Sequence, residues 1–335
     1  LRAIVDGAEP DDQQAALAQR LVEAGQGLVL LGQAALAHPA AASLRALAAY
    51  LAAATGCAFN VLTQGGNSRG AWLAGAVPHR GPGGASADPG LNASAMLESP
   101  LDCYLLWGIE PGFDIDNPAR ALATLRAAKH VIAIASYATT GMRGFAEVIL
   151  PLVPTAESEG SMVNFDGDVI SFTAAAKPAG EARPGWKILR RLGEVLQLEG
   201  CAQTSLAQLQ EELQAAIGQG GVSAAEPDPQ LPAYADGLYR IGEVPVYSVD
   251  AQCRRAAPLQ ASALADSDFV GLNAADAGRL GLEDGAQARV SQGEKSTELA
   301  VRVTSRVPEG GAWVRSATCA THMLGHAFAP IKVEV

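Results

Sequence analysis

Two stretches of the sequence carry residue types that could bind anions. Gly65-Gly-Asn-Ser-Arg-Gly70 has the composition of a phosphate loop, but it lacks the Lys-Ser/Thr ending of a P-loop. It also lacks the tight glycine turn directly after a strand that a dinucleotide site needs. Composition alone therefore favours a surface loop. In Pro78-His79-Arg80-Gly-Pro-Gly-Gly84, a histidine and an arginine stand on a stiff scaffold; they could bind an anion or donate to carbonyls within the loop.

Other candidate groups are carboxylates, histidines and thiols. Glu157-Ser-Glu159-Gly160 could be a pair for acid–base work, although carboxylates beside a glycine turn are more often solvated. His322 and His326 have the spacing of two metal ligands on a helix, but no Asp, Glu or Cys stands beside them, which favours a structural or solvent-facing pair. The 5 cysteines are widely scattered, so we predict buried free thiols and no metal.

The first two thirds of the chain alternate between apolar strands and helices. This rhythm predicts a Rossmann-like parallel sheet with helices on both faces, an α/β fold. Residues 63–90 are rich in Gly and Pro and predict a long irregular loop. The predicted strands are residues 27–32, 103–108, 131–135 and 148–151.

The last third has shorter elements. One short helix, 274–280, and six short strands fit a small closed barrel. We therefore predict an α/β domain over residues 1–217, a linker over 218–237 and a six-stranded barrel over 238–335. The predicted barrel strands are residues 244–249, 270–273, 287–291, 298–304, 312–315 and 331–335.

Composition excludes several classes of function. The chain has 335 residues and a net charge of −11, which argues against a nucleic-acid binder and against docking on anionic lipid. No apolar stretch is long enough to predict a transmembrane helix, and no signal peptide is evident. Because Leu1 is not an initiator Met, we expect the chain to be a piece of a longer protein.

Three stretches taken together resemble the molybdopterin oxidoreductase superfamily. The first combines Ala146-Glu-Val-Ile-Leu-Pro151, Glu157-Ser-Glu-Gly-Ser-Met-Val-Asn164-Phe-Asp-Gly167 and Glu181-Ala-Arg-Pro-Gly-Trp186. The second, Asn273-Ala-Ala-Asp-Ala-Gly-Arg-Leu-Gly-Leu-Glu-Asp-Gly285, resembles the signature of the molybdopterin dinucleotide-binding domain, a double-psi β-barrel. The third, Asn67-Ser-Arg-Gly-Ala-Trp-Leu-Ala-Gly-Ala-Val-Pro-His-Arg80, resembles a loop that marks the iron–sulfur subunit (designated G) of bacterial NADH–quinone oxidoreductase, respiratory complex I.

This resemblance implies a role and partners. The chain would be the carboxy-terminal half of that iron–sulfur subunit, whose cluster-binding cysteines lie in the amino-terminal half, outside this sequence. It would serve as a structural and assembly module among the other peripheral-arm subunits, supporting electron transfer from NADH to quinone without a catalytic site of its own. The complex would be attached to the cytoplasmic side of the bacterial inner membrane, with no nucleic acid bound and no direct membrane insertion.

The resemblance also supplies candidate positions for a vestigial cofactor cleft. In this family the loop reads Glu-Gly-Arg-Val-Gln, whereas here it reads Asp166-Gly-Asp-Val-Ile170, so a cation is replaced by an anion. A carboxylate there would repel the phosphates of a bis-molybdopterin cofactor, and we expect no cofactor or metal in this chain. The alternative is the cofactor-binding half of an active molybdenum or tungsten oxidoreductase, similar to formate dehydrogenase. The cleft candidates are Asn67, His79, Arg80, Glu157, Gly160, Asn164 and Asp168.

Overall fold

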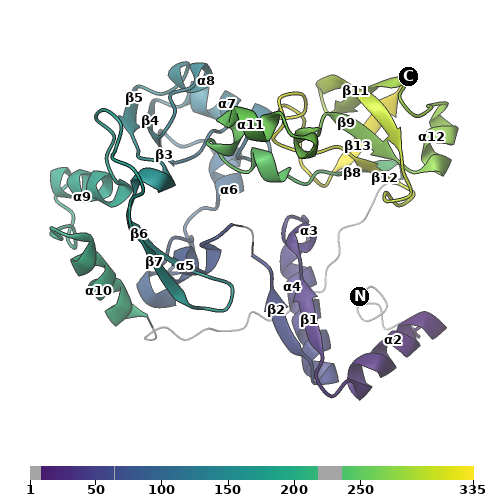
Figure 1. The fold of residues 1–335 in the computed structure, drawn as a ribbon, viewed down its shortest axis with the longest axis horizontal. Helices are drawn as coiled ribbons and strands as arrows, with labels where there is room; N and C mark the ends of the chain where they lie inside the picture. The colour runs from purple at the N-terminus through teal and green to yellow at the C-terminus, as the bar shows by residue number, and fades with distance from the viewer. Residues whose placement is uncertain (1–8, 64, 218–235) are drawn as a thin grey trace. The chain divides into compact units, whose positions relative to one another are not determined.

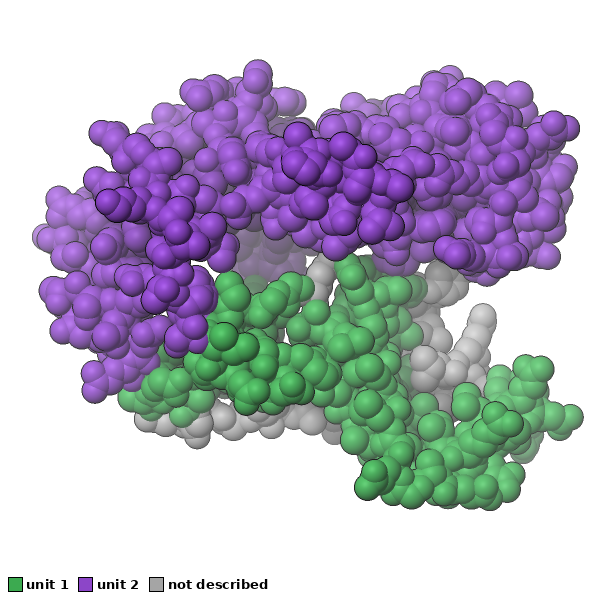
Figure 2. All heavy atoms as spheres, in the orientation of Figure 1, with its two compact units in different colours: residues 1–88, 162–170, 213–235 green, residues 89–161, 171–212, 236–335 purple. Residues whose placement is uncertain are grey.

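The computed structural model describes residues 9–63, 65–217 and 236–335, and the chain divides into two compact units (Figure 2). Among the described residues, no helix is both long and apolar enough to cross a lipid bilayer. Unit 1 comprises residues 1–88, 162–170 and 213–235, and unit 2 comprises residues 89–161, 171–212 and 236–335.

The centre of unit 1 is a pair of parallel strands, β1 (Leu28–Leu31) and β2 (Ala58–Val61). Helix α4 (Ala41–Thr55) connects them and packs against both strands. It is rich in Ala and Leu, which favour helix, and it ends at Gly56, whose φ of 72° suits a residue without a side chain. The other helices of unit 1 are α2 (Asp12–Glu23), α3 (Gln33–Leu36), α5 (Ser68–Leu73) and the 3₁₀ turn η1 (Pro82–Gly84).

Unit 2 begins with a three-stranded parallel sheet in the order β3-β4-β5 (Figure 1). Burial alternates along β3: Tyr104 and Leu106 are buried, whereas Leu105 and Trp107 on the opposite face are exposed. The buried face packs against helices, which supply Leu125 to the same core. The strands are β3 (Cys103–Trp107), β4 (His130–Ala135) and β5 (Val148–Pro151), and the helices are α6 (Ala93–Glu98), α7 (Pro118–Ala127) and α8 (Thr140–Arg143).

A hairpin and two helices follow the sheet along the chain. Strands β6 (Gly160–Val163) and β7 (Val169–Phe172) pair with each other, and α9 (Gly185–Val195) and α10 (Leu206–Ala216) come after them. Helix α9 starts at a glycine for a steric reason: a Cβ at Gly185 would lie 2.6 Å from the ring of Trp107.

The last hundred residues form a closed barrel (Figure 1). Its strand order is β10-β11-β9-β12-β8-β13. Its core is aliphatic and includes Val270, Leu272, Val290, Leu299 and Val333. The strands are β8 (Leu238–Ile241), β9 (Phe269–Leu272), β10 (Gln287–Gln292), β11 (Lys295–Val303), β12 (Gly311–Trp313) and β13 (Pro330–Glu334). Before β9 lie short turns and helices, η3 (Val246–Ser248), η4 (Cys253–Arg255), α11 (Ala257–Gln260) and η5 (Ala263–Ala265); α12 (Ala274–Leu280) follows it.

The predicted fold class, an α/β part with parallel strands and a closed six-stranded barrel, is confirmed. Three details differ. The parallel strands lie in two sheets, with β2 unforeseen, because the Gly- and Pro-rich stretch 63–90 separates β2 from β3 along the chain. That stretch contains α5 and η1. Helices α6, α7 and α8 cover one face of β3; on its other face Leu105 and Trp107 are partly exposed, and the start of α9 at Gly185 contacts the Trp107 ring.

The first barrel strand is also displaced from its predicted position. It is β8, not residues 244–249, which contain Pro245 and a 3₁₀ turn, because Pro lacks the N–H that a central strand needs. Of the predicted linker, residues 218–235 lie outside the described residues. All five cysteines are free, but the prediction that they are buried is wrong, since Cys103 and Cys319 are exposed and the other three are half-buried.

Candidate functional site

Three of the seven predicted cleft residues meet at the turn between β6 and β7. Asn164 shapes the turn: its Oδ1 accepts hydrogen bonds from the backbone N–H groups of Gly167 at 2.9 Å and Asp168 at 2.8 Å. The Asn164 amide also donates to the Asp168 carboxylate at 3.2 Å. Asn67, at the start of α5, accepts from the backbone N–H of Val163 at 2.9 Å and so fixes the end of β6.

Sequence reasoning missed the cation at this turn, Arg69. Its Nη1 donates to the carbonyl of Phe165 at 3.5 Å. Gly167 has a φ of 99°, a conformation that favours glycine, and a Cβ there would lie 3.2 Å from the Arg69 guanidinium.

The turn does not fit the phosphates of a molybdopterin dinucleotide, the ligand that the resemblance implies. The side-chain donor of Asn164 and the N–H groups of Gly167 and Asp168 are bonded within the turn itself. The exposed charges at the turn are the carboxylates of Asp166 and Asp168 and the guanidinium of Arg69, two negative and one positive. Two like charges next to a phosphate are unfavourable.

Replacing Asn164 with Ala should lower the free energy of opening this turn by about 1–2 kcal/mol, because two backbone N–H groups lose their acceptor. Amide hydrogen exchange at Gly167 and Asp168 would measure the change. Asn164→Asp is the comparison, since it keeps an acceptor for both amides but places a second carboxylate beside Asp168. Unchanged exchange in the Ala variant would show that the side chain does not hold the turn.

His79 and Arg80 both contact the indole ring of Trp72. The Arg80 guanidinium carbon is 5.0 Å from the ring centroid of Trp72, and the His79 ring meets the same indole edge-on at 6.2 Å. The sequence left two alternatives for this pair, anion binding or donation to loop carbonyls, and the structure does not contain the second. Among the described residues, neither side chain makes a hydrogen bond or an ion pair. The Arg80 Nε is shielded from solvent and has no partner.

The last two cleft candidates have local contacts. The Glu157 carboxylate accepts from the backbone N–H of Ala179 at 2.9 Å, which ties the 3₁₀ turn η2 (Thr155–Glu157) to a later loop. Gly160 faces the ring of Phe172, which a Cβ would approach to 3.0 Å. The seven residues therefore fall into four local groups: Asn67 with Asn164 and Asp168, His79 with Arg80, Glu157 alone and Gly160 alone.

His322 and His326 bind different groups in place of a shared metal. The His322 Nδ1 lies 2.9 Å from the carbonyl oxygen of Cys319, and its ring stacks on Phe113 with centroids 4.9 Å apart. His326 bonds through Nδ1 to the carboxylate of Asp116. Among the residues that the structure describes, no three His, Cys, Asp or Glu side chains are grouped as metal ligands.

A largely buried cluster of charges in unit 2 joins the loop after β3 to the segment between the barrel strands β8 and β9. We call it the seam cluster: Glu110, Asp114, Arg254 and Arg255. The Glu110 carboxylate accepts from Arg254 at 2.9 Å and from Arg255 at 2.5 Å, and Asp114 accepts from Arg254 at 2.9 Å. The side chains of Glu110 and Arg254 are only 6% and 9% exposed.

Aromatic rings complete the seam cluster. The Arg254 guanidinium lies 5.0 Å from the centroid of Phe113, and that of Arg255 lies 4.4 Å from the centroid of Tyr137. Its acids and bases are about 140 residues apart in sequence, so no local pattern could pair them; the one sequence signal is the Arg254-Arg255 dipeptide in an acidic chain.

The barrel holds one almost fully buried cation, Arg240 on β8, at 2% exposure. It donates five hydrogen bonds, among them to the carbonyls of Val314 at 2.9 Å, Gly325 at 2.8 Å and Arg315 at 3.0 Å; the other two go to Gln292 and Ser316. Burial lowers the pKa of Arg240 to about 10, and the nearby charge of Asp116 opposes this shift. Arg240 thus fixes the connection between β12 and β13, which carries both His322 and His326.

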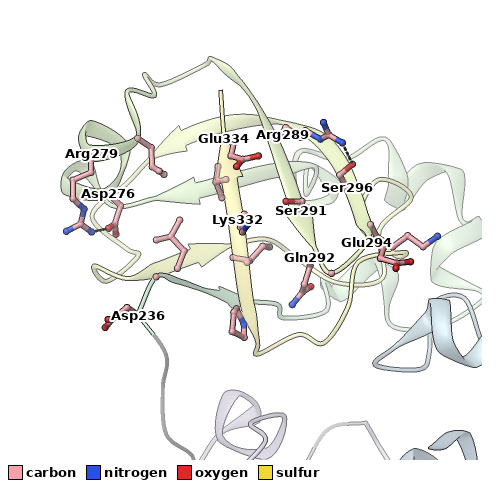
Figure 3. Close-up of a pocket in the computed structure, with 18 residues that line it drawn as sticks. Asp236, Asp276, Arg279, Arg289, Ser291, Gln292, Glu294, Ser296, Lys332 and Glu334 are labelled. Atoms are coloured by element: carbon pink, nitrogen blue, oxygen red, sulfur yellow. Dashed lines mark hydrogen bonds and ion pairs between the residues drawn. The ribbon is translucent and has the colours of Figure 1, made fainter.

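A groove of about 1100 Å³ runs over the outer surface of β10 and β13 (Figure 3). Arg289 and Ser296, joined by a hydrogen bond of 3.2 Å, lie at one end of it. No histidine or cysteine is among the described residues that line it, so its serines lack the base that a nucleophile needs. Its charges balance: the cations are Arg279, Arg289, Lys295 and Lys332, and the anions are Asp236, Asp276, Glu294 and Glu334.

Comparison with known proteins settles the family. Residues 13–195 match the family model of the molybdopterin oxidoreductases, and this match covers more than half of the sequence. The chain belongs to the molybdopterin oxidoreductase family. The match includes β1 to β5, the β6–β7 turn and α9, while the barrel lies beyond it.

The curated proteins that the chain resembles include oxidoreductase subunits and a nitrate reductase. The chain is 30% identical over 150 residues to the NADH-quinone oxidoreductase subunit designated G of Streptomyces coelicolor, covering 38% of this chain and 18% of that protein. It is 25% identical over 181 residues to NADPH-Fe(3+) oxidoreductase subunit alpha of Geobacter sulfurreducens, covering 49% and 21%. It is 30% identical over 123 residues to a nitrate reductase of Synechocystis, covering 35% and 17%. The matched stretch thus spans about a fifth of each relative.

Proposed function

We propose that the chain is a structural and assembly module of a subunit similar to the iron–sulfur subunit of NADH–quinone oxidoreductase, with no catalytic site of its own. The observation that carries this proposal is the β6–β7 turn, where Asp168 takes the side-chain donor of Asn164 and adds a negative charge. A phosphate would meet a carboxylate at that position.

The relatives support a role inside an electron-transfer complex. Two of them are named as subunits of NADH or NADPH oxidoreductases. By analogy, the protein would assemble with other subunits of a peripheral arm on the cytoplasmic side of the inner membrane, and electrons would pass through iron–sulfur clusters in other parts of the subunit. The seam cluster suits such a module, since it holds the barrel and the β3–β5 sheet together as one body.

One observation favours a second candidate, the cofactor-binding half of an active molybdenum enzyme. The identity to the nitrate reductase equals that to the Streptomyces NADH-quinone oxidoreductase protein, at 30%. The two candidates differ in what the intact protein contains, so metal content discriminates between them.

We expect the full-length protein, purified from its native host, to contain molybdenum and tungsten at background level. Acid treatment should release no fluorescent pterin. Inductively coupled plasma mass spectrometry and fluorescence would measure both, with a molybdenum enzyme purified from the same cells as the positive control. Stoichiometric metal together with a released pterin would overturn the structural role and support the second candidate.

A further inference from the structure

Arg80 and His79 are held on a rigid loop of unit 1. The loop closes on itself through the N–H of Gly81, which donates to the carbonyl of Ala85 at 2.8 Å, and the N–H of Gly84, which donates to the carbonyl of Gly81 at 3.1 Å. Gly75 packs so closely on it that a Cβ there would lie 2.3 Å from the Gly81 backbone. The two side chains therefore start from a fixed frame.

Trp72 fixes the direction of the Arg80 side chain. Its indole is bounded by Gly84, where a Cβ would lie 3.2 Å from the ring, and it carries the guanidinium 5.0 Å from its centroid. Stacking on an aromatic ring restrains a guanidinium and leaves its planar edge available for hydrogen bonds, which lowers the entropy cost of binding a partner.

Arg80 lacks the anion that comparable arginines have. In the described part of the chain, Arg302 pairs with Asp266 and Arg315 pairs with Glu243 while each also lies over an aromatic ring. Arg80 has the ring without an acid, and its buried Nε is unbonded. Because this Nε is shielded from solvent, an incoming carboxylate would bind the two Nη nitrogens, which have no partner among the described residues.

We propose that Trp72, His79 and Arg80 form a docking site for a carboxylate on an acidic segment of a partner protein. A guanidinium edge matches a carboxylate in two parallel hydrogen bonds, and the exposed His79 ring stands beside it as a further donor. Tryptophan and arginine are also the residue types that dominate protein interfaces. A polyanion is disfavoured, since nucleic acid needs a row of cations and this chain carries a net charge of −11. The inference rests on the proposed function in one respect, that the chain works inside a larger assembly.

Carbodiimide cross-linking of the assembled full-length protein carrying Arg80→Lys tests the site directly, because this reagent joins an amine only to a carboxylate in contact with it. We expect a cross-link from the substituted position to an Asp or Glu of another polypeptide, located by mass spectrometry. The Lys129–Asp102 pair, 2.8 Å apart, is the internal control for the reagent. A cross-link to this chain alone, or none while the control pair reacts, would overturn the proposal.

Charge reversal then measures the strength of the contact. Arg80→Glu should weaken binding to the cross-linked partner by about tenfold or more, as expected for a central charged contact. Arg45→Glu, at an exposed position on α4 of the same unit, makes the same change in net charge and should leave binding within about twofold. Equal effects of the two variants would contradict the proposal, and thermal unfolding would confirm that both fold. If the protein proves to contain molybdenum but the cross-link forms, the proposed function fails and the docking site stands.

Discussion

Replacing Arg240 with Met should destabilise the barrel by about 3 kcal/mol, a large effect for a single side chain. Met keeps the aliphatic volume but leaves the carbonyls of Val314, Arg315 and Gly325 without their donor. The relief of a desolvated charge offsets part of this loss. Hydrogen exchange of the intact chain, followed on peptides from β10 and β13, would measure it.

Arg306→Met is the matched control, because Arg306 is exposed and its side chain makes no bond in the described part of the structure. It should change the stability of the barrel, measured by hydrogen exchange, by less than about 0.5 kcal/mol. If both variants exchange alike, the connection between β12 and β13 does not depend on Arg240.

The lowered pKa of Arg240 also predicts how this effect depends on pH. With a pKa lowered to about 10 in the folded state and a higher pKa when unfolded, the side chain is protonated in both states below about pH 9. The stability difference between the native chain and the Met variant should therefore be constant from about pH 6 to 9. Above pH 10 the unfolded state binds more protons than the folded state, so the desolvation penalty of Arg240 falls and the native chain gains stability relative to the variant.

Replacing Glu110 with Gln should cost about 3–5 kcal/mol, because two guanidiniums of the seam cluster lose a buried countercharge. The amide nitrogen of Gln would also face donors. We expect the segment that carries Arg254 and Arg255 to detach from the β3–β5 sheet before the barrel itself unfolds. Limited proteolysis between residues 245 and 268, with urea titration, would detect this order.

Asp102→Asn is the control for this experiment. It removes the same charge from an ion pair with Lys129 whose side chains are 76% and 68% exposed, and such pairs contribute about 0–1 kcal/mol. Similar proteolysis of the two variants would show that burial does not strengthen the seam cluster.

Local signals in the sequence were enough to predict most elements of the fold. The predicted helix 274–280 is α12 residue for residue, since Asn273 caps its start and Gly281 ends it in the left-handed conformation. Strands β3, β4 and β5 lie within one residue of their predicted bounds, because each is a short apolar run ended by Gly, Pro or a polar residue.

What the sequence could not predict is set by contacts between distant residues. Glu110 and Arg254 are 144 residues apart, and the hydrogen-bond acceptors of Arg240 are 52 to 85 residues away from it. No local sequence pattern could therefore predict the ion pair or these hydrogen bonds. The cleft candidates came from a resemblance. Of these, Asn67, Asn164 and Asp168 meet at the β6–β7 turn, and the Asn164 side chain makes its hydrogen bonds within the turn itself.

The contacts between the β3–β5 sheet and the barrel also have a consequence for shorter forms of this protein. Glu110 and Asp114 receive Arg254, and Asp116 receives His326 and the backbone N–H of Ala327, all from the carboxy-terminal third. A protein that lost this third would keep three acidic side chains on one loop without these partners, and among them Asp114 would retain the backbone N–H of Glu110, at 2.6 Å. Relatives without the barrel should therefore carry neutral or apolar residues at these three positions, so that loss of the barrel and loss of the acids are inherited together.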